Sequence, residues 1–242
     1  MKPFEKLTVF LLASNETDEL RKTFNGILEN CKHDDIEKIV FFLKSADCPS
    51  AFIAQKIIEE KFFDKVEIAV QKSSNPSDAF AEIPAYASGS HFVIMASDGE
   101  MSTETVRDFI TLAKEKPSAI ICGAKWHKDS VVENHDLPRA FGSRLADKFA
   151  AFLFNRKETD LFSIFQIYPI ELYEQMNFNK KNLLYEYTLK PLRFGTEYIE
   201  IPTIYKKNDK RKATATFFQL IVIAVRYCYH VIRIRFSLKK HL

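Results

Sequence analysis

The sequence predicts an α/β protein with a mostly parallel sheet that is covered by helices on both faces. Three observations support this expectation. Short apolar runs alternate with longer helical patterns, no long linker rich in Pro, Gly or Ser divides the chain, and 242 residues are enough for one large core. Such alternation favours parallel strands joined by crossover helices. Ligands of these sheets bind outside the carboxyl ends of the strands.

The first half of the chain follows a regular alternation. Apolar runs of strand length predict strands over residues 7–13, 38–43, 66–70, 92–96 and 119–122. Helical periodicity between them predicts helices over residues 17–29, 50–61, 78–87 and 102–114. The order corresponds to successive βαβ units in one sheet.

The second half extends the same sheet, but its strands and helices no longer alternate regularly. After a polar loop through residue 135, we expect helices over residues 139–154 and 183–194 and strands over residues 162–168 and 197–201. We therefore expect one domain over residues 1–205, followed by an appendage over residues 206–242.

The appendage combines a basic run with an apolar helix pattern. The basic residues are Lys206, Lys207, Lys210, Arg211 and Lys212. On a helix over residues 213–236, one narrow polar stripe would hold Gln219, Arg226, His230, Arg233 and Ser237. The remaining apolar surface, with basic residues beside it, is typical of an amphipathic helix on an anionic membrane. The alternatives are packing on its own domain or on a second copy of the chain.

Composition limits the functions that fit this chain. The net charge of +3 and the lack of aromatic residues within the basic run argue against nucleic acid as a partner. Four cysteines without a CxxC pair predict reduced thiols and a cytoplasmic location. We expect no signal peptide, and no segment reaches the roughly 18 uncharged apolar residues of a spanning helix.

An acidic cluster follows the predicted strand over residues 92–96. Asp98 and Glu100 stand two residues apart at its carboxyl end. Mg²⁺ and Mn²⁺ take carboxylate ligands and often share their shell with substrate phosphates, so this spacing indicates diphosphate chemistry. Solvated or helix-capping carboxylates are the alternative, which Ser102 and Glu104 nearby also fit.

Four segments carry a resemblance to a known family. They are VFLLASNE over residues 9–16, ASDGE over 96–100, GAKW over 123–126 and DLFSIFQIY over 160–168. In the same order, they are similar to V-x-I-P-T-Y-N-E, D-A-D-x-Q, G-S-R-Y and D-L-T-S-G-F-R-L-Y of dolichyl-phosphate mannose synthase-like enzymes. The chain thus resembles family 2 glycosyltransferases, which implies their Rossmann-like GT-A fold with, here, a C-terminal amphipathic helix.

The resemblance also implies site residues. Donor binding would involve Ser14, Asn15, Glu16, Lys125, Arg139 and Gln166. Asp98 and Glu100 would hold Mg²⁺ or Mn²⁺, whose Lewis acidity would assist departure of the diphosphate. The expected catalytic carboxylates are Asp98, Asp160 and Glu186, of which the last two would act as a base toward a sugar hydroxyl.

The implied reaction is inverting transfer of a sugar from a UDP- or GDP-linked donor to a polyprenyl phosphate or a cell-envelope glycan. A phosphate acceptor is already anionic, so positioning alone could suffice. The basic run would meet the lipid phosphate, and the helix would hold the enzyme peripherally on the cytoplasmic face of a membrane. A homodimer is a further expected assembly.

Some positions depart from the family pattern. Ala96 replaces the first aspartate of the metal motif, and Leu43-Lys44 stands where the family has a D-D-G-S-x-D turn. Asn75-Pro76-Ser77 replaces a glycine-rich turn, where a ligand could approach the backbone closely. Two other hypotheses therefore stay open: a catalytically degenerate GT-A-like domain that binds a lipid or a partner, and an α/β domain that dimerises through its last helix.

Overall fold

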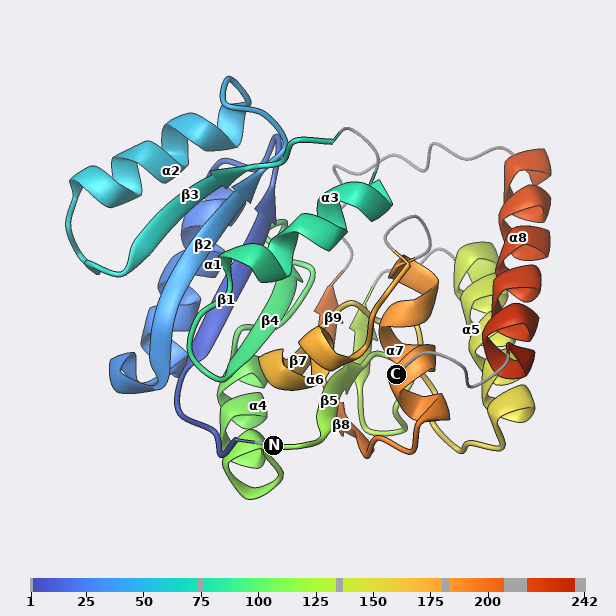
Figure 1. The fold of residues 1–242 in the computed structure, drawn as a ribbon. Coiled ribbons are helices and arrows are strands. Elements are labelled where there is room, and N and C mark those ends of the chain that lie inside the picture. Colours follow the sequence, from blue (N-terminus) through green and yellow to red (C-terminus); the bar gives the residue numbers. More distant parts are fainter. Residues whose placement is uncertain (1, 74–75, 134–136, 180–182, 207–216, 238–242) are drawn as a thin grey trace.

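The predicted fold class is confirmed by the computed structural model, a seven-stranded, mostly parallel sheet flanked by helices (Figure 1). The structure describes residues 2–73, 76–133, 137–179, 183–206 and 217–237, without the side chains of residues 76–77, 137–139, 217–221 and 223. The strand order is β3-β2-β1-β4-β7-β5-β8. All neighbours are parallel except at β7, which runs antiparallel to both β4 and β5.

The first half forms the elements that its alternation predicts. The strands are β1 (Leu7–Ala13), β2 (Ile36–Leu43), β3 (Val66–Val70), β4 (His91–Ala96) and β5 (Ile120–Ala124). The helices are α1 (Asp18–Asn30), α2 (Pro49–Glu59), α3 (Pro76–Glu82) and α4 (Glu104–Glu115), with short 3₁₀ turns at His33–Asp35 and Ile83–Tyr86. The helix expected over residues 78–87 is therefore α3 followed by a 3₁₀ turn.

The second half contains the remaining elements. They are β6 (Val131–Glu133), α5 (Leu137–Phe154), β7 (Gln166–Pro169), α6 (Ile170–Gln175), α7 (Leu183–Arg193), β8 (Tyr198–Pro202), β9 (Ile204–Lys206) and α8 (Phe217–Phe236). β6 and β9 pair in a small parallel sheet of their own. The prediction of a strand from residue 162 was wrong at its start, because β7 begins only at Gln166.

Two apolar clusters lie on opposite faces of the large sheet. Along β1, Leu7, Val9 and Leu11 belong to the cluster beneath α1, α2 and α4, while Phe10 belongs to the cluster on the other face. This alternation follows from the pleat of a strand. Because both faces are covered, the strands are nearly continuous apolar runs, which explains why they could be predicted.

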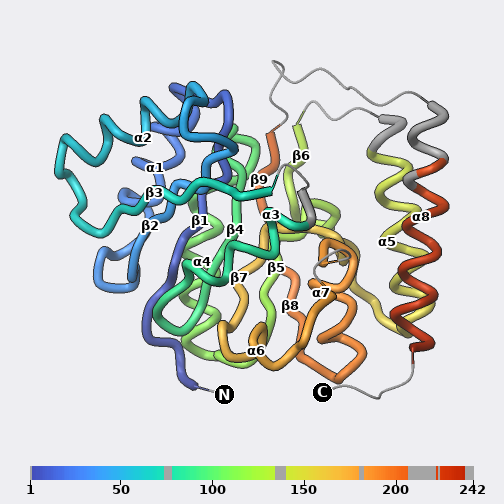
Figure 2. Tube along the Cα trace, turned by 45° about the horizontal axis from the view of Figure 1, so that its top comes forward, coloured from blue at the N-terminus to red at the C-terminus, as the bar shows by residue number. Residues whose placement is uncertain are grey.

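The last helix lies beside α5 at one end of the sheet, as both ribbon and trace show (Figures 1 and 2), and also contacts α7. Its Tyr227 hydroxyl donates to the carbonyl oxygen of Ala146 in α5, 3.0 Å away. Arg233 donates to Glu186 of α7 at 2.7 Å. Among the helices of the described ranges, none has both the length and the hydropathy required to cross a bilayer.

Candidate functional site

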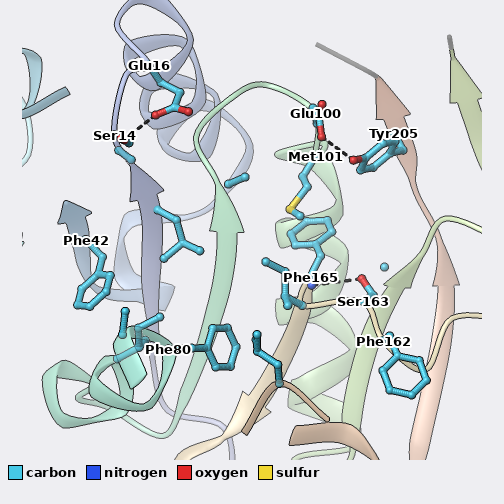
Figure 3. A pocket seen from close by; sticks show the side chains of 18 of the residues that line it. Ser14, Glu16, Phe42, Phe80, Glu100, Met101, Phe162, Ser163, Phe165 and Tyr205 are labelled. Atoms are coloured by element: carbon cyan, nitrogen blue, oxygen red, sulfur yellow. Dashed lines mark hydrogen bonds between the residues drawn. The ribbon is translucent and has the colours of Figure 1, made fainter. Parts of the chain in front are cut away.

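A cavity of about 620 Å³ opens at the carboxyl ends of β1, β2, β4 and β5 (Figure 3), the edge where α/β sheets bind ligands. Strand ends supply one wall and the segment before β7 supplies the opposite wall. Its polar lining residues are Ser14, Glu16, Lys44, Gln71, Glu100, Lys125, Ser163, Thr203 and Tyr205. Apolar side chains such as Phe42, Phe80 and Phe162 line much of the rest.

The turn after β1 is ordered by its own carboxylate. Glu16 accepts hydrogen bonds from the backbone N–H groups of Ser14 and Asn15, at 2.6 and 2.9 Å. The Ser50 hydroxyl of α2 donates to the carbonyl oxygen of Glu16 at 2.6 Å. Ser14 and Glu16 line the cavity, whereas Asn15 is exposed and lies outside its lining.

The two carboxylates of the acidic turn after β4 lie in different surroundings. Gly99 has a φ of +76°, a left-handed conformation that glycine adopts at little cost. This turn lets the N–H of Glu100 donate to Asp98 at 3.1 Å. Asp98 is buried and does not line the cavity, whereas Glu100 does and accepts the hydroxyl of Tyr205 at 2.5 Å (Figure 3).

These residues fit a divalent cation only as part of a shared site. Ala96, in place of the family's first aspartate, lines the cavity with a methyl group. Within the described ranges, no group of three or more His, Cys, Asp or Glu side chains is arranged to hold a metal ion. Mg²⁺ commonly binds through one or two carboxylates together with substrate phosphates. Of the two carboxylates in the Asp98–Glu100 turn, Glu100 lines the cavity and Asp98 is buried behind it.

Lys125 brings a positive charge to the cavity from the end of β5. Its backbone N–H donates to Asp160 at 2.8 Å, and its ammonium nitrogen lies 3.9 Å from the other oxygen of the same carboxylate. The ammonium also lies 5.2 Å from the centre of the Trp126 ring. Asp160 therefore positions Lys125 from behind the cavity wall rather than facing the cavity itself.

Buried carboxylates organise the chain next to this wall. The backbone N–H of Leu161 donates to Asp147 at 3.0 Å, and that of Asp160 donates to Glu200 at 2.7 Å. Burial, followed by the charge of Asp160, raises the pKa of Asp147 to about 8. Burial also raises the pKa of Asp160, although Lys125 opposes the shift. Asp160 is the member of the pair that contacts the Lys125 ammonium.

Other predicted site residues lie away from the cavity. Gln166 is fully buried, and its side-chain amide donates to the carbonyl oxygen of Ser163 and to Thr188. Glu186 accepts hydrogen bonds from Arg233 and from the backbone of Asn179, so it connects α7 to α8. None of the three predicted catalytic carboxylates, Asp98, Asp160 and Glu186, lines the cavity.

The predicted cations are only partly described. Arg139 lies in α5, but its side chain falls outside the description. Lys206 is exposed and its ammonium lies 3.9 Å from Glu133. The remaining basic residues, Lys207, Lys210, Arg211 and Lys212, lie outside the described residues.

Sequence analysis missed Lys44 as a site residue. Its place directly after β2, at the carboxyl edge, was the signal that could have indicated it. Tyr205 was also missed as a partner of Glu100. Their contact depends on the pairing of Met101 with Tyr205, a non-local bridge that no local pattern predicts. Lys44 and Lys125 are thus the two lysines of the cavity lining.

Several solved structures share this fold. The Mycobacterium tuberculosis glucosyl-3-phosphoglycerate synthase, in complex with Mn²⁺, UDP and phosphoglyceric acid, has a TM-score of 0.68 and 10% identity. That alignment covers 98% of this chain and 80% of the synthase chain. A complex of the same enzyme with Mn²⁺, UDP-glucose and phosphoglyceric acid has a TM-score of 0.66 and 10% identity, covering 98% and 82%. A further mycobacterial protein reaches 0.65 with 10% identity, covering 95% and 74%.

Sequence comparison identifies the family. No curated protein matches the chain at a significant level. The two named structural neighbours above are complexes of glucosyl-3-phosphoglycerate synthase, not of a dolichyl-phosphate mannose synthase-like enzyme, so the narrower resemblance stays a prediction. The profile of glycosyl transferase family 2 matches residues 8–176, which is more than half of the chain and includes most of the cavity lining. The chain therefore belongs to glycosyl transferase family 2.

Proposed function

We propose that this protein transfers a sugar from a UDP-linked donor to an acceptor. The observation that carries the proposal is the cavity at the strand ends, because the four segments with family-like sequence all contribute to its lining. Membership of glycosyl transferase family 2 supports the reaction class. The UDP and UDP-glucose complexes of the structurally similar synthase support UDP rather than GDP as the nucleotide.

The residues of the cavity suit a departing diphosphate. Lys125 and Lys44 would attract its negative charge, and the surrounding apolar side chains strengthen such electrostatic interactions by excluding water. Together with the donor phosphates, Glu100 would hold Mg²⁺ or Mn²⁺, which would neutralise charge on the leaving group. Asp98 would support this role by accepting the N–H of Glu100 and so fixing the turn.

The proposed acceptor is a polyprenyl phosphate, with a cell-envelope glycan as the alternative. A glycan hydroxyl needs a base, yet Asp160 and Glu186 are occupied by structural contacts behind the cavity. The lining carboxylates Glu16 and Glu100 accept hydrogen bonds from backbone N–H groups and from Tyr205. A phosphate oxygen is already anionic, so in-line attack requires only positioning. Such an acceptor would place the protein peripherally on the cytoplasmic face of a membrane.

Donor binding tests the first part of this proposal. Calorimetric titration with UDP, UDP-sugars and GDP-sugars, with and without Mn²⁺, should show UDP-selective binding. Lys125→Ala should weaken this binding about tenfold, because it removes a charge-assisted contact. Lys128→Ala is the matched control, since Lys128 is exposed and lies outside the cavity lining. Absence of binding to any of these ligands at millimolar concentration would overturn the proposal.

A transfer assay separates the enzyme from its degenerate alternative. The full chain is incubated with a radiolabelled UDP-sugar and either a polyprenyl phosphate or a soluble glycan. Label that moves to the lipid phosphate, and is lost in Glu100→Gln, supports the proposed reaction. Donor binding without transfer to either acceptor would favour the non-catalytic GT-A-like domain suggested by Ala96.

A further inference from the structure

α8 carries apolar side chains on two opposite sides. Its inner side buries Tyr227, Val231 and Ile234, and His230 of the predicted polar stripe lies among them against Tyr185, with ring centres 4.4 Å apart. Arg226 of the same stripe is exposed. The opposite side carries exposed apolar residues at spacings of three and four: Val222, Val225, Tyr229, Ile232 and Phe236. This is one continuous helical stripe. A surface helix normally has one apolar stripe, which faces the core, so the outward stripe of α8 is additional.

The neighbouring helix α5 repeats this arrangement. Its inner side contributes Ala150, Ala151 and the carboxyl group of Asp147 to the protein interior. Its outer side carries Phe141, Leu145 and Phe152, which are 71%, 59% and 82% exposed. Sequence analysis had assigned this helix to the body of the domain. We call the exposed apolar residues of both helices the α5/α8 surface: Phe141, Leu145, Phe152, Val222, Val225, Tyr229, Ile232 and Phe236.

The two helices lie side by side at one end of the molecule in both views (Figures 1 and 2). Arg235 of α8 donates to the carbonyl oxygen of Leu153 in α5 at 2.7 Å, which supports this packing. Eight large apolar side chains on two adjacent helices exceed the scattered exposure that is normal for a monomer. The α5/α8 surface therefore needs a partner.

Charge distinguishes between the two candidate partners. The only acidic residue in the sequence of α5 and α8 is Asp147, which is 1% exposed. By contrast, Arg144, Lys148 and Arg226 are exposed on the same helices. A second copy docked through the same surface would bring like charges together, which destabilises an isologous interface. An anionic bilayer offers both the apolar layer and the opposite charge.

The α5/α8 surface is also connected to the cavity. Phe162, a lining residue, packs on Tyr227 of α8 with ring centres 4.3 Å apart. Arg144 of α5 stacks on Trp126 at 4.5 Å, directly beside the lining residue Lys125. Contacts of the helices with a lipid surface would thus be close to one wall of the cavity. A lipid-borne phosphate could reach the cavity from the surface that these helices touch.

We infer that the α5/α8 surface docks the protein onto an anionic phospholipid bilayer, with both helices lying at the interface. The inference adds to the proposed function a way for the protein to reach a lipid-linked acceptor, and it rests on that proposal only for the identity of the acceptor. Binding of the UDP-linked donor does not require either helix to touch lipid. Membrane docking and donor binding can therefore be disproved independently of each other.

Vesicle co-sedimentation of the full chain tests the inference. Wild type should bind vesicles of mixed phosphatidylcholine and phosphatidylglycerol, more weakly as NaCl rises, and bind pure phosphatidylcholine poorly. Phe152→Glu combined with Phe236→Glu should weaken binding about tenfold or more, because charged groups enter the apolar interface. The matched control is Phe62→Glu, since Phe62 is 81% exposed but follows α2, away from the α5/α8 surface.

Each result has a defined meaning. UDP titration in lipid-free buffer should be unchanged in the double variant, which verifies its fold independently of lipid. Equal loss of vesicle binding in Phe62→Glu would overturn the inference. A second pair of results would also overturn the inference: wild type fails to bind vesicles, and analytical ultracentrifugation shows a wild-type dimer that the double variant abolishes. These results would assign the α5/α8 surface to a second copy of the chain. Equal binding to neutral and anionic vesicles would contradict the role given to charge.

Discussion

The two long walls of the cavity are held in place by different groups. The strand wall consists of the ends of β1, β2 and β4, where Lys44 and Ser97 donate backbone hydrogen bonds to β1 at 3.0 and 3.1 Å. Apolar residues fill the sheet behind it. The loop wall, residues 162–165, instead follows a segment whose N–H groups donate to the buried carboxylate of Asp147 and the half-buried carboxylate of Glu200.

This difference indicates what each wall can tolerate. On the strand wall, the backbone ladder sets the shape, so a replacement such as Ala96 for aspartate changes the chemistry and leaves the architecture intact. On the loop wall, shape depends on side-chain hydrogen bonds, one of which is accepted by Asp147, whose pKa burial raises to about 8. Substitutions and changes of pH should therefore alter the shape of the loop wall more than that of the strand wall.

The largest expected effect is at Gly123, where the two walls meet. A Cβ added there would lie 2.8 Å from Phe165 and 3.2 Å from Thr105. Gly123→Ala should thus displace the loop wall, lower the free energy of unfolding by about 1–3 kcal/mol and weaken UDP binding. Urea denaturation and calorimetry measure both effects.

The control for this substitution is Gly142→Ala. In α5, an added Cβ at Gly142 meets nothing within 4 Å. That variant should be as stable as wild type or up to about 1 kcal/mol more stable, because alanine favours helix. Equal destabilisation of the two variants would show that the walls are not in tight contact.

A smaller effect is expected from the pH dependence of the loop wall. The pKa of Asp147 is raised to about 8 in the folded protein, far above the value of about 3.9 expected in the unfolded chain. Its favourable contribution is complete below the unfolded pKa and is lost as pH rises through the folded pKa. Wild type should therefore lose stability relative to Asp147→Asn between pH 5 and pH 8.

The expected change is at least about 1.4 kcal/mol, the equivalent of one pKa unit. Urea denaturation of both proteins at the two pH values measures it. Asparagine can still accept the N–H of Leu161, so the comparison isolates ionisation. A constant difference between the two proteins across this range would mean that Asp147 is ionised throughout.

The smallest effect is expected where Tyr205 meets the strand wall. Tyr205→Phe removes the hydroxyl that donates to Glu100 and should lower the free energy of unfolding by about 1 kcal/mol. Tyr229→Phe is the control, since its ring is 62% exposed and surface changes rarely exceed about 0.5 kcal/mol. If Glu100 is needed for Mn²⁺-dependent UDP binding, Tyr205→Phe should alter the Mn²⁺ concentration at half-saturation. An unchanged Mn²⁺ response would assign the contact to stability alone.

The fold could be predicted largely from local pattern. The strands Leu7–Ala13 and Val66–Val70 have the predicted bounds, because polar or turn residues limit each apolar run. β6 and β9 were missed, since three residues carry no measurable periodicity and their pairing is non-local. β7 starts late because the apolar residues before it line the cavity instead of joining the sheet.

The site was predictable at the level of segments but not of side chains. The family-like segments include strand ends around the cavity, and Ser14, Glu16, Glu100 and Lys125 line it. Sequence spacing does not show on which side of the backbone a carboxylate lies. Asp160 and Glu186 face other parts of the protein for this reason, through contacts with residues far away in sequence.

The antiparallel strand β7 has a consequence for how the two parts of the sheet are joined. β4 and β5 do not pair with each other, and within the described sheet only β7 joins them, through Val93 opposite Ile167 and Ile167 opposite Ile121. Loss of the β7 pairing would therefore disconnect the β3-β2-β1-β4 ladder from the β5-β8 pair. The cavity is lined from both sides of this connection, by Ala96 at the end of β4 and by Gly123 of β5, so its shape depends on β7 staying paired with both strands.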